Sequence, residues 1–210
     1  YTALGSQLRF WSLSYRPEDM FSEGKLPKNF SELIETSWTS AMDSRFLRYC
    51  INKNFDALPS DIDKAFKFRS SETRSYSLTS NLEFHFPTDP SASADHLRQL
   101  GGLLRITTVA IENFFEHAPE ESVLSLSVDI HNDRLCVECQ NQRKSACDMT
   151  GQTGASHMGL RGREVMRFLS RLFLHDLAPD FSFSTEKNDF QSAHDQYRTS
   201  LIFHKPKWIL

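Results

Sequence analysis

The chain has 210 residues, of which 39% are hydrophobic and 24% are charged. This composition is typical of a soluble globular protein with one domain, or with one domain and a smaller appendage. A formal net charge of -3, with no sustained basic stripe, argues against nucleic-acid binding. No apolar run approaches the roughly 20 residues of a membrane helix, so we expect no membrane insertion by this chain. Because it begins at Tyr1 without a signal peptide, we expect a cytoplasmic fragment of a longer protein.

The four cysteines are Cys50, Cys136, Cys139 and Cys147. Cys136 and Cys139 form a CxxC pattern, which can indicate a metal or redox site. In an alternating strand, however, residues three apart point to opposite faces, and no second Cys or His pair follows at a zinc-like spacing. We therefore interpret them as ordinary strand cysteines of a protein in a reducing compartment.

Residues 1–70 are predicted to form a mainly helical N-terminal segment, which we interpret as the end of a dimerisation or linker region. Within it, residues 29–51 have apolar side chains near helical spacing, and Asn29 with Glu32 forms a capping-box pattern. A second, short helix is predicted over 60–68.

From residue 71 to 210 the pattern changes to alternating strands separated by two helices. In chain order we expect a strand at 75–86, a helix at 96–118 capped by Asp95, strands at 122–130 and 135–141, a glycine-bearing loop, a helix at 160–173, and closing strands at 180–187 and 197–204. This order predicts an α/β two-layer sandwich, in which helices cover one face of a mixed, mostly antiparallel sheet.

The sequence lacks the usual signatures of other nucleotide sites and of hydrolases. It contains no GxxxxGK[ST] motif and no GxGxxG after a predicted strand, and no serine lies in a nucleophile elbow. The function must therefore be sought in polar residues at the ends of the predicted elements.

Polar residues of this kind occur in four segments. Asn113 and His117 are four residues apart on a helix and share a face, where an Asn can hold hydrated Mg²⁺ and, through it, phosphates. Asn141 ends its strand in phase with the apolar residues before it. A loop with three glycines then leads into a helix N-terminus, whose free N–H groups suit an anion. Thr199 lies early in the last strand.

In this order, the four segments resemble the motifs of the ATP-binding domain of sensor histidine kinases, the GHKL or Bergerat-fold ATPases. ENFFEHA (112–118) resembles the N box, and VECQN (137–141) resembles the beginning of the G1 box. GASHMGLRG (154–162) resembles the G2 box, and YRTSLIFHKP (197–206) resembles the final strand and its exit. The resemblance covers about residues 72–206.

The resemblance implies that residues 71–210 form a GHKL-type domain that binds ATP and Mg²⁺. Asn113 would then coordinate Mg²⁺, with His117 beside the phosphates. Asn141 would face the adenine amino group, and Thr199 would support the base. A lid over 142–158 would close the site, and the nucleotide would be bordered by residues of the G2 box, namely Gly154, Gly159, Leu160, Arg161 and Gly162. No catalytic residue is assigned.

Three positions depart from the family pattern. Val109 stands where the family often carries a Glu or Asn that orients water or metal, Asn141 replaces the usual Asp, and Arg143 replaces a Gly. These departures favour a nucleotide pocket without full hydrolytic competence. Considered without the resemblance, Asn113 could instead bond a neighbouring backbone group, and the glycines could be plain loop residues.

The leading hypothesis is an ATP-binding catalytic domain of a sensor-histidine-kinase-like protein that donates the γ-phosphate to a histidine on a helical domain. Its partners would be ATP and a protein phosphoacceptor, either a helical dimerisation domain or a response regulator, and a homodimer is an open alternative. The acceptor is not evident, because the His175–Leu177 stretch is interpreted as a surface position at a helix end, and His96 opens the predicted N-box helix. A rival hypothesis is a degenerate, non-catalytic docking or phosphotransfer scaffold, and a third is an anti-sigma or serine-kinase-type switch protein.

Overall fold

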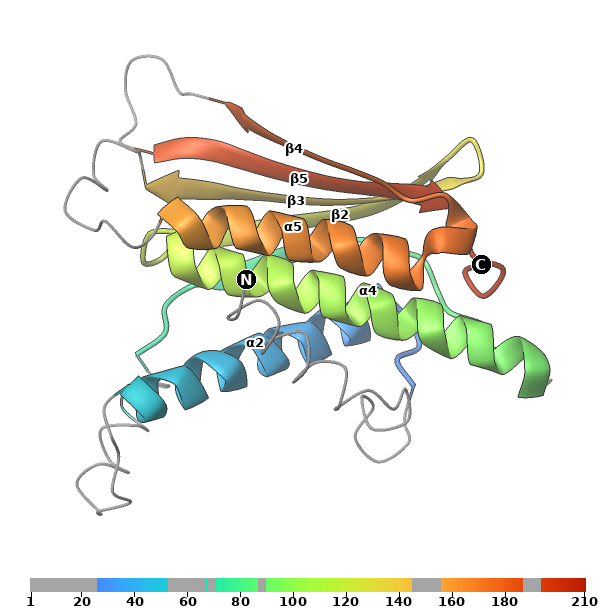
Figure 1. The fold of residues 1–210 in the computed structure, drawn as a ribbon, viewed down its shortest axis with the longest axis horizontal. Helices are drawn as coiled ribbons and strands as arrows, with labels where there is room; N and C mark the ends of the chain where they lie inside the picture. The colour runs from blue at the N-terminus through green and yellow to red at the C-terminus, as the bar shows by residue number, and fades with distance from the viewer. Residues whose placement is uncertain (1–25, 53–66, 68–70, 87–89, 145–155, 187–193) are drawn as a thin grey trace.

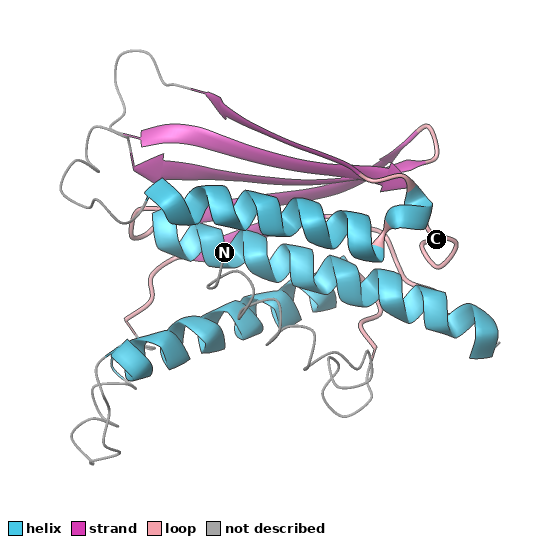
Figure 2. Cartoon of the chain, viewed as in Figure 1, coloured by secondary structure: helices cyan, strands magenta, loops and turns pink. Residues whose placement is uncertain are grey.

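The computed structural model describes residues 26–52, 67, 71–86, 90–144, 156–186 and 194–210. These residues form two layers, a five-stranded sheet and a row of helices along one of its faces (Figures 1 and 2). The predicted fold class, an α/β two-layer sandwich, is therefore confirmed. None of the described helices is both long and apolar enough to cross a membrane.

The sheet is mixed and mostly antiparallel, as predicted. Its strands run in the order β1-β2-β3-β5-β4. β1 pairs in parallel with β2, whereas the other three pairs are antiparallel. The strand bounds are β1 Ser75–Thr79, β2 Val123–His131, β3 Arg134–Lys144, β4 Asp180–Glu186 and β5 His194–His204.

The sheet has one apolar face, which packs against the helices, and one polar face. On β2 the buried side chains are Leu124, Leu126 and Val128, and the residues between them are more exposed. On β3, Cys139 is buried and Cys136 is half-buried. Because they are three positions apart along the strand, the two cysteines face opposite sides, as predicted.

Helix α2 (Phe30–Asn52) begins at the predicted capping box. The backbone N–H of Glu32 donates to Oδ1 of Asn29 over 3.0 Å. The Glu32 carboxylate in turn accepts a hydrogen bond from the backbone N–H of Lys28 at 2.8 Å. These two bonds satisfy backbone donors that have no partner inside the helix.

Helix α2 shares one hydrophobic core with α4 and the sheet. Phe30, Leu33 and Ile34 are buried in the same cluster as the apolar face of the sheet. At the contact with α4, the Ser37 hydroxyl lies 2.8 Å from that of Thr107. The three helices therefore lie side by side, with α4 in the middle (Figure 1).

Helix α4 (Pro90–His117) begins earlier than predicted. The expected start at 96, with Asp95 as the cap, is wrong, because Asp95 lies inside the helix. A proline is tolerated in the first helical turn, where its missing N–H would have had no partner. At the other end, Arg74 donates to the carbonyl oxygens of Ala118 (3.0 Å) and Pro119 (3.1 Å), which anchors the end of α4 that carries the site.

Helix α5 (Ser156–Phe173) also begins before its predicted start at Leu160. The predicted lid over 142–158 therefore needs correction, because its first residues belong to β3 and its last residues to α5. The remainder, 145–155, lies outside the described residues. After α5, a short 3-10 helix, η4 (His175–Leu177), has exposed His and Asp side chains, which agrees with the surface interpretation.

Two further expectations changed. The strand predicted over 75–86 ends at Thr79, and Phe84 instead forms an isolated bridge to Ile209 near the C-terminus. Phe84 also packs edge-on against Trp208, with ring centroids 5.0 Å apart, so an alternating apolar pattern here reflects aromatic packing rather than a longer strand. The helix predicted over 60–68 lies outside the described residues, except for Lys67.

Candidate functional site

The floor of the candidate site consists of neighbouring residues on β3 and β5. In the antiparallel register, Asn141 lies opposite Tyr197, and Cys139 lies opposite Thr199. Because residues two apart on a strand share a face, all four side chains belong to the helix-facing side of the sheet. The floor thus carries three hydrogen-bonding side chains, Asn141, Tyr197 and Thr199, and one thiol.

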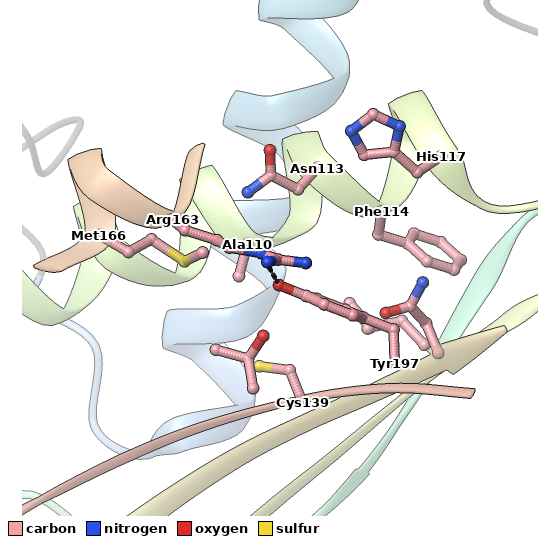
Figure 3. A pocket seen from close by; sticks show the side chains of 11 residues that line it. Ala110, Asn113, Phe114, His117, Cys139, Arg163, Met166 and Tyr197 are labelled. Carbon is pink, nitrogen blue, oxygen red and sulfur yellow. Dashed lines mark hydrogen bonds between the residues drawn. The ribbon is translucent and has the colours of Figure 1, made fainter. Parts of the chain in front are cut away.

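Helix α4 forms one wall of the site. Ala110, Asn113, Phe114 and His117 all line the pocket (Figure 3). Their spacing of three, four and seven residues places them on one face of the helix. Phe114 is 1% exposed and anchors this face in the core, whereas Asn113 and His117 are half-buried and turn polar groups toward the pocket rim.

Helix α5 supplies the other wall through Arg163 and Met166. It approaches α4 at Gly162, where a Cβ atom would lie 2.3 Å from Oδ1 and 2.4 Å from Nδ2 of Asn113. These distances are far shorter than any normal contact. The Asn113 amide therefore lies directly against the α5 backbone, and only glycine at 162 leaves room for it in this position.

The Asn141 amide is oriented by its own strand. Its Nδ2 donates to the carbonyl oxygen of Gln142 at 2.9 Å. An amide has donors only on nitrogen and accepts only through oxygen, so this bond leaves Oδ1 as the group that Asn141 offers to a ligand donor.

Arg163 and Tyr197 meet across the pocket. Nε of Arg163 donates to the Tyr197 hydroxyl at 2.7 Å (Figure 3). The Arg163 guanidinium carbon also lies 4.0 Å from the centre of the Phe183 ring and 4.9 Å from that of Tyr197. The cation is therefore held by one hydrogen bond and by two aromatic faces.

These side chains leave little open space inside the pocket. The volume available to the centre of a water molecule is about 20 Å³, which is room for about one water. A purine base does not fit in this space as it stands.

Cys139 lies at the floor of the pocket. Burial raises the pKa of its thiol to about 12, so this thiol is protonated at neutral pH.

The structure brings four of the predicted site residues to one pocket: Asn113, His117, Asn141 and Thr199. Gly154 lies outside the described residues. Gly159, Leu160 and Arg161 lie in the first turns of α5, and Gly162 follows them. The roles assigned to all of these residues stay predictions.

The sequence did not assign Arg163, Met166, Cys139 and Tyr197 to the site, although all four line the pocket. Tyr197 is in phase with Thr199 on the same strand, and this alternation is a signal that could have identified it. Arg163 gives no comparable signal, because its direction depends on how α5 lies across the sheet. Among the described residues, no three His, Cys, Asp or Glu side chains gather as a metal-binding cluster.

No protein-family model matches the sequence, and no curated protein matches it. The solved structures similar in fold include a mycobacterial sensor histidine kinase, MprB, with 8% identity, a TM-score of 0.45, and coverage of 84% of this chain and 97% of MprB. The catalytic domain of the histidine kinase ThkA has 9% identity and a TM-score of 0.41, with coverage of 84% and 94%. The Acinetobacter baumannii histidine kinase AdeS has 14% identity and a TM-score of 0.38, with coverage of 96% and 98%.

These three likenesses are remote. At identities of 8–14% and TM-scores of 0.38–0.45, they do not establish what this chain binds or does. The functional question therefore turns on the pocket itself.

Proposed function

We propose that the pocket binds Mg-ATP, and that the chain is the ATP-binding catalytic domain of a sensor-histidine-kinase-like signalling protein. The observation that carries this proposal is the convergence of Asn113, His117, Asn141 and Thr199 on one pocket. These residues come from α4, β3 and β5, and the first and last are 86 positions apart by number (199 − 113). Only the fold brings them together.

The side chains present suit such a ligand. The carbonyl oxygen of the Asn113 amide is a hard donor of the kind that Mg²⁺ prefers. The oriented Oδ1 of Asn141 can accept a hydrogen bond from an exocyclic amino group. His117, near the C-terminal end of α4, supplies an imidazole N–H beside the phosphates. Thr199 is 7% exposed and supports the base from below.

In the proposed reaction, the γ-phosphoryl group of ATP passes to an imidazole nitrogen of a histidine on a separate helical domain, leaving ADP and a phosphohistidine. Phosphoryl transfer requires mainly positioning and charge neutralisation from the protein. Asn113 and His117 serve these purposes in our proposal. Val109 is 6% exposed, belongs to the core and does not line the pocket, so we expect slow hydrolysis by water.

A second candidate is a non-catalytic docking or phosphotransfer scaffold on the same fold. The observation that favours it is the small open volume, because the space left between the lining side chains, Arg163 and Tyr197 among them, holds about one water. The two candidates differ in one measurable property, the affinity for nucleotide.

Isothermal titration of Mg-ATP into the purified chain tests the proposal. We expect saturable binding that weakens at least about tenfold in Asn113→Ala and in Asn141→Ala, since each removes a polar contact worth about 1.4 kcal/mol or more. Gln140→Ala is the matched control for Asn141→Ala, because Gln140 is the preceding residue on β3 and faces the other side of the sheet.

If neither the wild type nor variants with an enlarged pocket, such as Arg163→Ala and Tyr197→Ala, bind Mg-ATP at millimolar concentration, the proposal is refuted and the scaffold is favoured. Binding that is lost in Asn113→Ala but unchanged in Asn141→Ala would keep the metal site and move the base elsewhere.

A further inference from the structure

Arg163 is half-buried at the pocket and contacts two aromatic side chains there. It hydrogen-bonds the Tyr197 hydroxyl at 2.7 Å, and its guanidinium carbon lies over the rings of Phe183 (4.0 Å) and Tyr197 (4.9 Å). Arg167, one turn further along α5, also lies over the Phe183 ring, at 5.3 Å. Arg163 lines the pocket and Arg167 does not, although both contact the same aromatic ring.

Tyr197 lies across the pocket rather than at its edge. Figure 3 shows its ring extending beneath Asn113 and above Cys139, with the hydroxyl directed at Arg163. In the sheet register it stands directly opposite Asn141, the residue whose oxygen is oriented for a ligand amino group. The tyrosine ring therefore lies beside Asn141 and, two residues along β5, Thr199, the two residues proposed to contact a base.

We infer that Arg163 and Tyr197 hold this pocket closed: joined to each other, they compete with the base of a nucleotide for one space. A base enters only when the Arg163–Tyr197 hydrogen bond breaks and the ring turns away from Cys139. The identity of the ligand rests on the proposed function, whereas the closure itself does not.

The energetic consequence follows from a two-state pocket. Where only a fraction of molecules has an open pocket, the apparent dissociation constant is the intrinsic constant divided by that fraction. A hydrogen bond from a charged donor and two cation–aromatic contacts favour the closed form. Removing them raises the open fraction, so nucleotide affinity increases although the variant has lost polar groups.

The sign of the effect separates this inference from two ordinary alternatives. If Tyr197 were a stacking surface for the base, Tyr197→Ala would weaken binding. If Arg163 were a phosphate contact, Arg163→Ala would weaken the binding of ATP more than that of adenosine. If Arg163 and Tyr197 instead compete with the base, each substitution tightens nucleotide binding. Adenosine and Mg-ATP should then gain affinity by the same factor, about tenfold, in Arg163→Ala and in Tyr197→Ala.

A readout that needs no nucleotide is the thiol of Cys139, which lines the pocket beneath Tyr197. In a background with Cys50, Cys136 and Cys147 changed to Ser, the rate of alkylation at Cys139 by a small iodoacetamide reports opening. We expect this rate to rise at least about tenfold in Arg163→Ala and Tyr197→Ala. Tyr197→Phe, which loses only the hydroxyl, should give a smaller rise in the rate, and Arg167→Ala should leave it unchanged.

The outcomes are distinguishable. Faster alkylation together with tighter adenosine and ATP binding supports both the inference and the proposed function. Faster alkylation without nucleotide binding in any variant supports the closure and overturns nucleotide as the ligand. Unchanged alkylation in variants that retain the wild-type far-UV spectrum and melting temperature overturns the inference, as does weaker nucleotide binding in Tyr197→Ala.

Discussion

Helices α4 and α5 run antiparallel and approach each other closely at two glycines. One of these contacts belongs to the core that stabilises the fold, and the other belongs to the proposed binding site. At one end, Gly102 of α4 lies against Phe173 of α5; at the other, Gly162 of α5 lies against Asn113 of α4. The two contacts are 11 residues apart along each helix (113 − 102 and 173 − 162), about 16 Å at the usual helical rise.

The two glycines face neighbours that respond differently to crowding. A Cβ at 102 would lie 2.3 Å from Cβ of Phe173, an atom fixed to the α5 backbone. A Cβ at 162 would instead meet the amide of Asn113, which can turn about its own side-chain bonds. The first contact therefore sets how close the helices lie, and the second sets only where one polar group lies.

The largest expected effect is on stability, from Gly102→Ala. The added methyl group must push α5 away from α4, and because its neighbour is a fixed atom only 2.3 Å away, we expect a cost at the upper end of the usual range for overpacking a core, about 3 kcal/mol. Alanine's better helix propensity, worth about 1 kcal/mol, offsets part of this cost. We expect a net loss of about 2 kcal/mol in the free energy of unfolding, measured by urea denaturation. A variant as stable as the wild type would mean that the helices can separate here without cost.

The next effect is on binding, from Gly162→Ala. The methyl group displaces the Asn113 amide, so we expect Mg-ATP affinity to fall about tenfold while the free energy of unfolding changes by less than about 1 kcal/mol. Titration calorimetry and urea denaturation measure the two quantities. The control is a double-mutant cycle: on an Asn113→Ala background, Gly162→Ala should have no further effect on affinity. An additive loss would show that Gly162 acts through another residue.

The smallest expected effect concerns the end of the helix pair near Gly102, where a hydrogen-bond network joins η4 to the C-terminus. Nε1 of Trp208 donates to Gln99 (2.8 Å), and Nε2 of Gln99 donates to the Asp176 carboxylate (2.7 Å). Burial alone would raise the pKa of Asp176, but hydrogen bonds from Arg98 and Gln99 outweigh it and hold this pKa below the ordinary value of 3.8.

Because the folded-state pKa of Asp176 is lowered, its contribution is present above pH 3.8 and is lost as the pH falls below that value through the folded-state pKa. The carboxylate is 37% exposed, so solvent screening limits the contribution to less than about 1 kcal/mol. We expect Asp176→Asn to be slightly less stable at pH 7 and to lose this acid-dependent part, as followed by thermal melts between pH 2.5 and 7. Nucleotide affinity at pH 7 should not change, and a fall there would link the two ends of the helix pair.

The sequence predicted those features that repeat along the chain. Alternation identified the strands and placed Asn141 in phase with the apolar residues of its strand, and the four-residue spacing placed Asn113 and His117 on one helix face. The capping pattern at Asn29 located the start of α2 to within one residue. All of these features depend on neighbours near in sequence, so one chain suffices to predict them.

The missed features depend on tertiary contacts. The bond between Arg163 and Tyr197 joins residues 34 positions apart and exists because α5 lies over β5. The contact between Gly162 and Asn113 depends on how deeply two helices approach each other. The helix starts were placed too late because polar first turns carry little periodic signal, and Pro90 can begin a helix as well as end one.

The burial of helix α4 also affects how fast backbone amides near the site exchange with solvent. Residues 99–109 of this helix are buried on every side, between α2, α5 and the sheet. Backbone amides in such a segment exchange with solvent only when the whole domain unfolds, whereas amides at helix ends exchange through local opening. In deuterated water, the amide protons of residues 99–109 should therefore be the last to exchange. Asn113 lies one turn beyond this segment, so the pocket wall adjoins the part of the chain that opens last.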